Sequence, residues 1–173
     1  MKGYDYSIPW WYYVKVCADS KKYRLSEIKG SKTDLNEFGR IVERVLLNLP
    51  THYERLEIDE YVIMSDHLHG IFILNERRDR SKTDPDKNII FNNSEQSETV
   101  PYHMHGLSEI VKSLKSFSSR EINKLIKPNR FKWQKSFYDR IIRNEKELYN
   151  IRRYIRQNPL KWELQKKVEN LES

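Results

Sequence analysis

The stretch that decides the fold runs from residue 56 to residue 74. It reads Leu56-Glu57-Ile58-Asp59-Glu60-Tyr61-Val62-Ile63-Met64, then Ser65-Asp66, then His67-Leu68-His69-Gly70-Ile71-Phe72-Ile73-Leu74. Both outer runs are rich in β-branched and aromatic residues and have the length of strands. The two residues between them leave room only for a tight turn, so the strands must be antiparallel neighbours. The sequence therefore predicts a β-hairpin near the middle of the chain.

A strand and a helix precede this hairpin. Residues 8–17 are aromatic and β-branched, which is typical of a strand buried on both faces. After a polar stretch, apolar residues recur at helical spacing between an N-cap at Thr33 or Asp34 and a stop at Pro50.

A similar pattern follows the hairpin. Residues 76–105 are polar and long for a loop in a compact domain, so we expect a mobile or functional segment. An amphipathic helix over 107–126 and a short strand over 137–142 come next. A last helix begins in a capping box at Asn144 and ends at Pro159, leaving a charged tail over 160–173.

The resulting order is β-α-β-β-α-β-α. It predicts an α+β fold of the ferredoxin-like, split β-α-β type, with one antiparallel sheet and a single domain over 1–173. In that topology the first and third strands are neighbours at the centre of the sheet. His67 and His69 therefore begin a central strand.

Composition limits the classes of function. Among 173 residues, 32 Lys and Arg face 25 Asp and Glu, which gives a formal charge of +7 beside eleven Tyr and four Trp. This combination favours an anionic, ring-bearing partner such as nucleic acid. No apolar run approaches the ~18 residues of a membrane span. Since no apolar signal segment begins the chain and Cys17 is its one cysteine, we expect a cytoplasmic protein with no membrane partner.

His67 and His69 are the first candidate for chemistry. Side chains alternate along a strand, so the two imidazoles project from one face and can close on one divalent metal ion. Two histidines that alternate by coincidence, on the surface or in the core, remain the other interpretation. A histidine-triad hydrolase is excluded, because its third alternating position is Ile71. Asp66 can orient an imidazole or stabilise the turn, and we favour the turn.

The last helix supplies the partners for these histidines. Tyr154 and Asn158 are four residues apart and share a helix face, so one surface offers a nucleophile and a neutral oxygen ligand. The other interpretation is a core tyrosine and an asparagine that ends the helix before Pro159. His103 and His105 also alternate, but no strand fixes their rings on one side, so we do not assign them a metal.

Several of these motifs together resemble a known family. His67-Leu68-His69 before an apolar strand is similar to the His-hydrophobic-His (HUH) motif of single-strand DNA nucleases. Tyr154-Ile155-Arg156-Gln157-Asn158-Pro159 resembles the tyrosine motif of the single-tyrosine HUH transposases. The REP-associated tyrosine transposases are the nearest group, because Trp133-Gln134-Lys135-Ser136-Phe137-Tyr138 and Arg143-Asn144-Glu145 also match their pattern. The resemblance covers roughly residues 11–162.

The resemblance implies the HUH endonuclease fold and cleavage and rejoining of single-stranded or hairpin DNA through a 5′-phosphotyrosine. It implies Tyr154 as nucleophile, and His67, His69 and Asn158 as ligands of one Mg²⁺ or Mn²⁺, although imidazole and oxygen ligands also suit Zn²⁺. Relatives include monomers and homodimers. Asn158 stands where many related transposases have the longer Gln.

Charge suggests which residues contact DNA. Lys112 and Lys115 share the outer face of the 107–126 helix, and Arg152 and Arg153 lie beside Tyr154, so we predict that these four act as a group on phosphates. The alternative function is a non-catalytic, ferredoxin-like protein that binds single-stranded nucleic acid, such as a domesticated transposase. That alternative predicts that Tyr154 and both histidines are dispensable.

Overall fold

The computed structural model describes residues 8–76 and 105–171, and the predicted loop over 76–105 therefore lies almost entirely outside the described residues. Six strands and three helices form the described parts of the chain. They are β1 (Trp10–Cys17), β2 (Ser26–Lys29), β3 (Lys32–Leu35), α1 (Glu37–His52), β4 (Leu56–Ile63), β5 (His67–Leu74), α2 (Leu107–Leu125), β6 (Tyr138–Ile142) and α3 (Glu145–Leu171).

Four strands make one antiparallel sheet in the order β4-β5-β1-β6. This order is the ferredoxin-like arrangement, so the predicted fold class is confirmed. The hairpin of β4 and β5 lies where the sequence predicts it, and β5 pairs with β1 at the centre of the sheet. Cys17 is opposite His67 in the β1–β5 register, and Lys15 is opposite His69.

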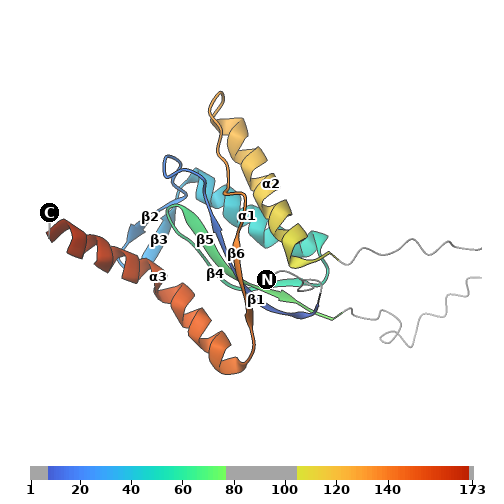
Figure 1. Ribbon diagram of the computed structural model, residues 1–173. Coiled ribbons are helices and arrows are strands. Elements are labelled where there is room, and N and C mark those ends of the chain that lie inside the picture. Colours follow the sequence, from blue (N-terminus) through green and yellow to red (C-terminus); the bar gives the residue numbers. More distant parts are fainter. Residues whose placement is uncertain (1–7, 77–104, 172–173) are drawn as a thin grey trace, which may run out of the picture.

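The two faces of the sheet are covered by different helices. The larger core lies on the face toward α1 and α2, where Tyr12, Val14, Leu68 and Phe72 are fully buried. The smaller core lies on the face toward α3, where Tyr13 and Ile71 meet Ile155 of α3. Figure 1 shows α1 and α2 on one side of the sheet and α3 on the other. Strand alternation therefore directs His67 and His69, together with Ile71, toward α3.

The polar stretch before α1 is not a loop throughout. Residues 26–35 form a separate two-stranded hairpin, β2–β3, which the sequence analysis missed because these short strands are mostly polar. The hairpin also moves the start of α1. The predicted N-cap at Thr33 or Asp34 is wrong, since both residues are in β3, and the Asn36 side chain accepts the N–H groups of Phe38 and Gly39 instead.

Both prolines that were expected to end helices lie inside them. Pro50 is followed by the last residues of α1, and Pro159 is in the middle of α3, so the predicted stop at Pro159 is wrong. The predicted tail is helical as far as Leu171. A proline inside a helix removes one hydrogen bond and favours a bend, and Figure 1 shows α3 changing direction partway along. α3 also contacts the β2–β3 hairpin.

Gly39 tests how closely α1 is packed. A Cβ at this position would lie 2.1 Å from the Leu25 carbonyl oxygen, which also accepts the Asn36 N–H. The clash is with backbone, so relief requires movement of the whole helix. We predict that Gly39→Ala lowers the free energy of unfolding by about 3 kcal/mol, measured by urea denaturation. Elsewhere in a helix the same change stabilises by roughly 0.5–1 kcal/mol, so a gain would contradict this packing.

Candidate active site

His67 and His69 face each other across a short gap. Their Nε2 atoms are 2.9 Å apart, and the two rings are nearly perpendicular with centroids 4.6 Å apart. Two ligand nitrogens at right angles, each about 2.1 Å from one ion, would be about 3.0 Å apart. The separation of the two Nε2 atoms, which both belong to β5, is therefore close to that of adjacent ligand positions around an octahedral ion.

The Nδ1 atom of each imidazole also has a hydrogen-bond partner. His67 Nδ1–H donates to Asp66 Oδ1 at 2.6 Å, and His69 Nδ1 is 2.6 Å from the Tyr13 hydroxyl oxygen. Such outer contacts fix the orientation and tautomer of metal-binding imidazoles. The preference for Asp66 as a turn residue is thus wrong for its side chain, which orients His67, while its backbone carbonyl accepts the Ala18 N–H.

One arrangement of protons satisfies all of these contacts. The Asp66 carboxylate accepts the Nδ1–H of His67, and the Nε2 lone pair of a neutral His67 then accepts the Nε2–H of His69. To offer both Nε2 lone pairs to a cation, His69 has to carry its proton on Nδ1, where the Tyr13 oxygen accepts it. The hydrogen bond from His67 lowers the pKa of the Asp66 carboxyl, so this carboxylate stays ionised.

His69 is held in the neutral form that a metal ligand requires. The residue is 1% exposed, and burial, reinforced by His67 and Lys15, lowers its pKa from 6.5 to about 3. Burial also raises the pKa of Tyr13, helped by the neighbouring Tyr154, so Tyr13 remains a protonated phenol. Tyr13 is therefore suited to hold His69 in place rather than to attack a substrate.

Tyr154 lies beside the imidazole pair. Its ring meets the His69 ring edge to face at 5.5 Å and the Tyr13 ring at 6.3 Å, yet 40% of the residue is exposed. The Lys161 ammonium lies 5.5 Å from the centre of the same ring. The structure thus brings Tyr154 next to His67 and His69, which are distant from it in sequence, and it leaves the Tyr154 side chain partly exposed to solvent.

Asn158 follows Tyr154 by one turn of α3 and is half-buried. A separation of four residues places it on the helix face that carries Tyr154 to His69. Within the described ranges, no cluster of three His, Cys, Asp or Glu residues could hold a metal ion. Asn158 carries a neutral side-chain oxygen on the helix face that also carries Tyr154.

Lys15 is a site residue that the sequence analysis missed. It is opposite His69 on β5 and opposite Tyr138 on β6, so it lies on the face that carries the imidazoles. It is half-buried, and among the described residues its ammonium has no ion pair or hydrogen bond. Tyr13, Lys15 and Cys17 alternate along β1 and therefore share one face of the sheet. The pairing of β1 with β5 adds that this face is the one that carries the imidazoles.

The four predicted DNA contacts do not form one group. Lys112 and Lys115 are on α2, whereas Arg152 and Arg153 are on α3, which packs on the opposite face of the sheet. Arg152 makes two hydrogen bonds to Asp59, at 2.7 and 2.8 Å, and thereby ties α3 to β4. Arg153 stays exposed beside the Tyr149 ring.

The alternating histidines near α2 have separate surroundings. His105 Nδ1 pairs with Glu109 Oε2 at 2.8 Å, and its ring meets Tyr53. His103 lies outside the described residues. None of the helices in residues 8–76 and 105–171 combines the length and the apolar character needed to cross a bilayer.

Comparison with solved structures identifies the fold. A REP-associated tyrosine transposase bound to a REP hairpin matches with a TM-score of 0.59 and 20% identity, over 93% of this chain and 74% of that chain. The chain has the fold of this transposase. The likeness agrees with the family resemblance in the HUH and tyrosine motifs, and it shows that the transposase fold extends over nearly the whole chain.

Two further matches were found. A protein of Haemophilus influenzae (strain Rd), described as uncharacterised, is 28% identical over 166 residues, which cover 94% of this chain and 87% of that protein. A proposed transposase from Deinococcus radiodurans R1 matches with 17% identity over 90% of this chain and 95% of that chain, but its TM-score of 0.48 is too low to establish a common fold. No protein-family model matches the chain.

The lowered pKa of His69 predicts a pH dependence of stability. Between pH 3 and 6.5 the unfolded chain binds a proton at His69 that the folded chain does not, so stability falls as pH falls through this range. The loss should approach 1.4 kcal/mol per pH unit. Urea denaturation in EDTA, compared with His69→Gln at each pH, isolates this contribution. A difference between the two proteins that does not change from pH 7 to pH 4 would contradict a buried neutral His69.

Proposed function

We propose that this protein is a transposase of the REP-associated type, which cuts single-stranded or hairpin DNA and transfers the cut strand through a covalent bond to Tyr154. The observation that carries the proposal is an exposed phenol whose ring contacts a paired-imidazole site. The motifs around both residues, and the shared fold, support it.

The protein would hold one Mg²⁺ or Mn²⁺ through His67, His69 and Asn158. The 2.9 Å separation of the Nε2 atoms and the neutral state of His69 suit such an ion. Bound there, a divalent cation withdraws charge from a phosphodiester oxygen and so favours attack at phosphorus. Because all three ligands are neutral, the charge of the ion is not cancelled by the protein.

Tyr154 would attack the phosphate, and Lys15 would bind it. Tyr154 Oη forms a bond to phosphorus, the bond from phosphorus to the 3′ oxygen breaks, and the phenol proton ends on that oxygen. The products are a 5′-phosphotyrosine and a free 3′-hydroxyl, and attack by a 3′-hydroxyl on the phosphotyrosine reverses the step. Lys15 offers its unpaired ammonium to the phosphate on the same face of the sheet.

The fold weighs against the alternative of a binder that stacks bases on its sheet. Such proteins use exposed aromatic residues on an open sheet face. Here α1 and α2 cover one face of the sheet and α3 packs on the other, so Tyr13 in the centre is 8% exposed, while the exposed Tyr138 is on the edge strand β6. A transposase that binds DNA but has lost cleavage is the remaining alternative, and the next experiment separates the two.

Tyr154→Phe should abolish covalent attachment to DNA and leave hairpin binding within about threefold of the unchanged protein, because only the attacking oxygen is removed. The measurement is incubation with a hairpin oligonucleotide and Mn²⁺, followed by denaturing electrophoresis for the protein–DNA species.

Two other tyrosines provide controls for that experiment. Tyr149 is 64% exposed on the same helix, so Tyr149→Phe should form the adduct normally. Tyr138 is 56% exposed and its ring is 6.1 Å from that of Tyr13, which makes it the rival nucleophile near the site. Loss of the adduct in Tyr138→Phe with retention in Tyr154→Phe would reverse the assignment. A complete absence of adduct in the unchanged protein would favour the binding-only alternative.

His67→Ala should lower Mn²⁺ affinity by at least tenfold and remove metal-dependent cleavage, because one of the two facing nitrogens is lost. Titration calorimetry measures the affinity without relying on activity. His52→Ala is the matched control, since His52 is on the exposed face of α1 and contacts Asn48. Unchanged Mn²⁺ affinity in His67→Ala would refute the metal assignment.

A further inference from the structure

Tyr154 and Asn158 share their face of α3 with a lysine. Lys161 follows Tyr154 by seven residues and Asn158 by three, and residues at these spacings form one row along a helix. Long side chains of a helix lean toward its N-terminus, so the Lys161 side chain extends back along this row. Its ammonium nitrogen lies 5.5 Å from the centre of the Tyr154 ring. A positive charge therefore lies next to the proposed nucleophile.

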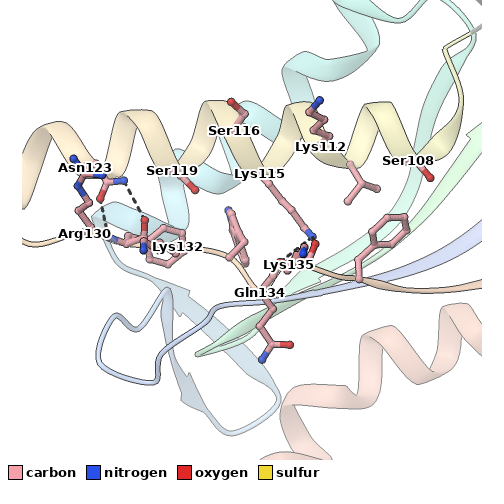
Figure 2. Close-up of a pocket in the computed structure, with 14 residues that line it drawn as sticks. Ser108, Lys112, Lys115, Ser116, Ser119, Asn123, Arg130, Lys132, Gln134 and Lys135 are labelled. Carbon is pink, nitrogen blue, oxygen red and sulfur yellow. Dashed lines mark hydrogen bonds between the residues drawn. The ribbon is translucent and has the colours of Figure 1, made fainter.

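The Lys161 ammonium is not committed to another group of the protein. It is exposed, and it has no hydrogen bond or ion pair among the described residues. Lys115 on α2 is different, because its ammonium donates to the carbonyls of Gln134 and Ser136 and so holds the segment before β6 (Figure 2). A cation–aromatic contact at an exposed site is weak. The Lys161 ammonium can therefore leave the ring face for an anion that binds beside it.

Neighbouring basic residues of α3 have other partners. Arg152 and Arg156 form ion pairs with carboxylates of β4, and Arg153 lies beside another tyrosine ring. Lys161 differs from these three arginines, because its charge is directed at the Tyr154 ring. The sequence analysis chose basic residues adjacent to Tyr154 in the chain, whereas the helix brings the cation from seven residues further on.

A cation at this position suits strand cleavage by Tyr154. While Tyr154 Oη bonds to phosphorus and the bond to the 3′ oxygen breaks, lysine side chains on the phosphoryl group stabilise the charge on its non-bridging oxygens. Lys15 approaches from β1, and Lys161 is on the helix that packs over this face of the sheet. The phenol proton ends on the 3′ oxygen and Lys161 keeps its own protons, so the contribution of Lys161 is electrostatic.

We propose that Lys161 is a further catalytic residue, whose ammonium binds a non-bridging oxygen of the phosphate that Tyr154 attacks. The same contact then holds the phosphate of the 5′-phosphotyrosine in place for the reverse step. This role rests on the proposed function, because it requires Tyr154 as the nucleophile. It also gives the part of α3 beyond Pro159 a task in the reaction, since that part carries Lys161.

The test is Lys161→Met, which keeps an unbranched apolar side chain and removes the charge. The rate of adduct formation is measured with a hairpin oligonucleotide, Mn²⁺ and saturating protein, so that weaker binding does not limit it. The rate should fall by about tenfold or more, because a cation on the reacting phosphate is lost. Hairpin affinity, measured by fluorescence anisotropy, and Mn²⁺ affinity, measured by calorimetry, should change by less than about threefold, since one exposed phosphate contact is a small part of DNA binding.

Two further variants control for the loss of a lysine. Lys166 is an exposed residue of the same helix, and its ammonium is 5.2 Å from the centre of the Trp162 ring, so Lys166→Met removes an equivalent contact away from Tyr154. This variant should form the adduct at the rate of the unchanged protein. Lys161→Arg restores the charge and should recover most of the rate that Lys161→Met loses.

A normal rate in Lys161→Met would overturn the role of Lys161 and leave the chemistry of Tyr154 intact. An equal loss of rate in Lys166→Met would overturn it too, because any lysine of the helix would then have the same effect. So would a loss confined to hairpin affinity, which would make Lys161 a binding residue only. Absence of the adduct in the unchanged protein would remove the proposed function and this role together, so the unchanged protein tells the two failures apart.

Discussion

The pairing of β1 with β5 at the centre of the sheet is the constraint on which the site depends. This register sets Cys17 opposite His67 and Lys15 opposite His69, and alternation along β5 then fixes both imidazoles on the face toward α3. A shift of β5 by one residue would send the imidazoles into the core beneath α1 and α2. Tyr12, Phe72 and Leu68 are fully buried in that core, so burial of their apolar surface opposes such a shift.

The position of Tyr154 depends on how α3 is seated. Leu148 and Ile155 of α3 are buried against Tyr13 and Ile71, and Ile155 is the next residue after Tyr154. Arg152 and Arg156 add ion pairs to Asp59 and Glu60 on β4, at the edge of the sheet. Apolar contacts and ion pairs therefore hold the first half of α3 on the sheet, while the phenol itself remains exposed. A nucleophile held by its neighbours rather than by its own burial stays accessible to a large substrate.

The sequence alone predicted the sheet because two signals were strong: the two-residue turn at Ser65-Asp66 and the helical spacing before and after it. It did not predict β2–β3, since short polar strands have no apolar alternation. It also predicted that the last helix stops at Pro159, whereas α3 continues to Leu171 and contacts the unpredicted hairpin.

Part of the candidate site was likewise predicted from the sequence, and part was found only in the structure. His67, His69 and Tyr154 were found from motifs, and the structure brings them together. Lys15 and Tyr13 reach the site through the pairing of β1 with β5, whereas Asp66 precedes His67 in the chain, and the sequence had offered its orienting role as the less favoured of two. Arg152 looked like a free cation because its partner Asp59 is distant in sequence.

The central claim is that the facing imidazoles and Asn158 hold one divalent cation next to Tyr154. The most direct test is anomalous diffraction from crystals of the protein grown with Mn²⁺. The account predicts one peak bridging the Nε2 atoms of His67 and His69, with the Asn158 side-chain oxygen as a further ligand. A peak at another site, or a pair of imidazoles still hydrogen-bonded to each other in saturating Mn²⁺, would contradict it.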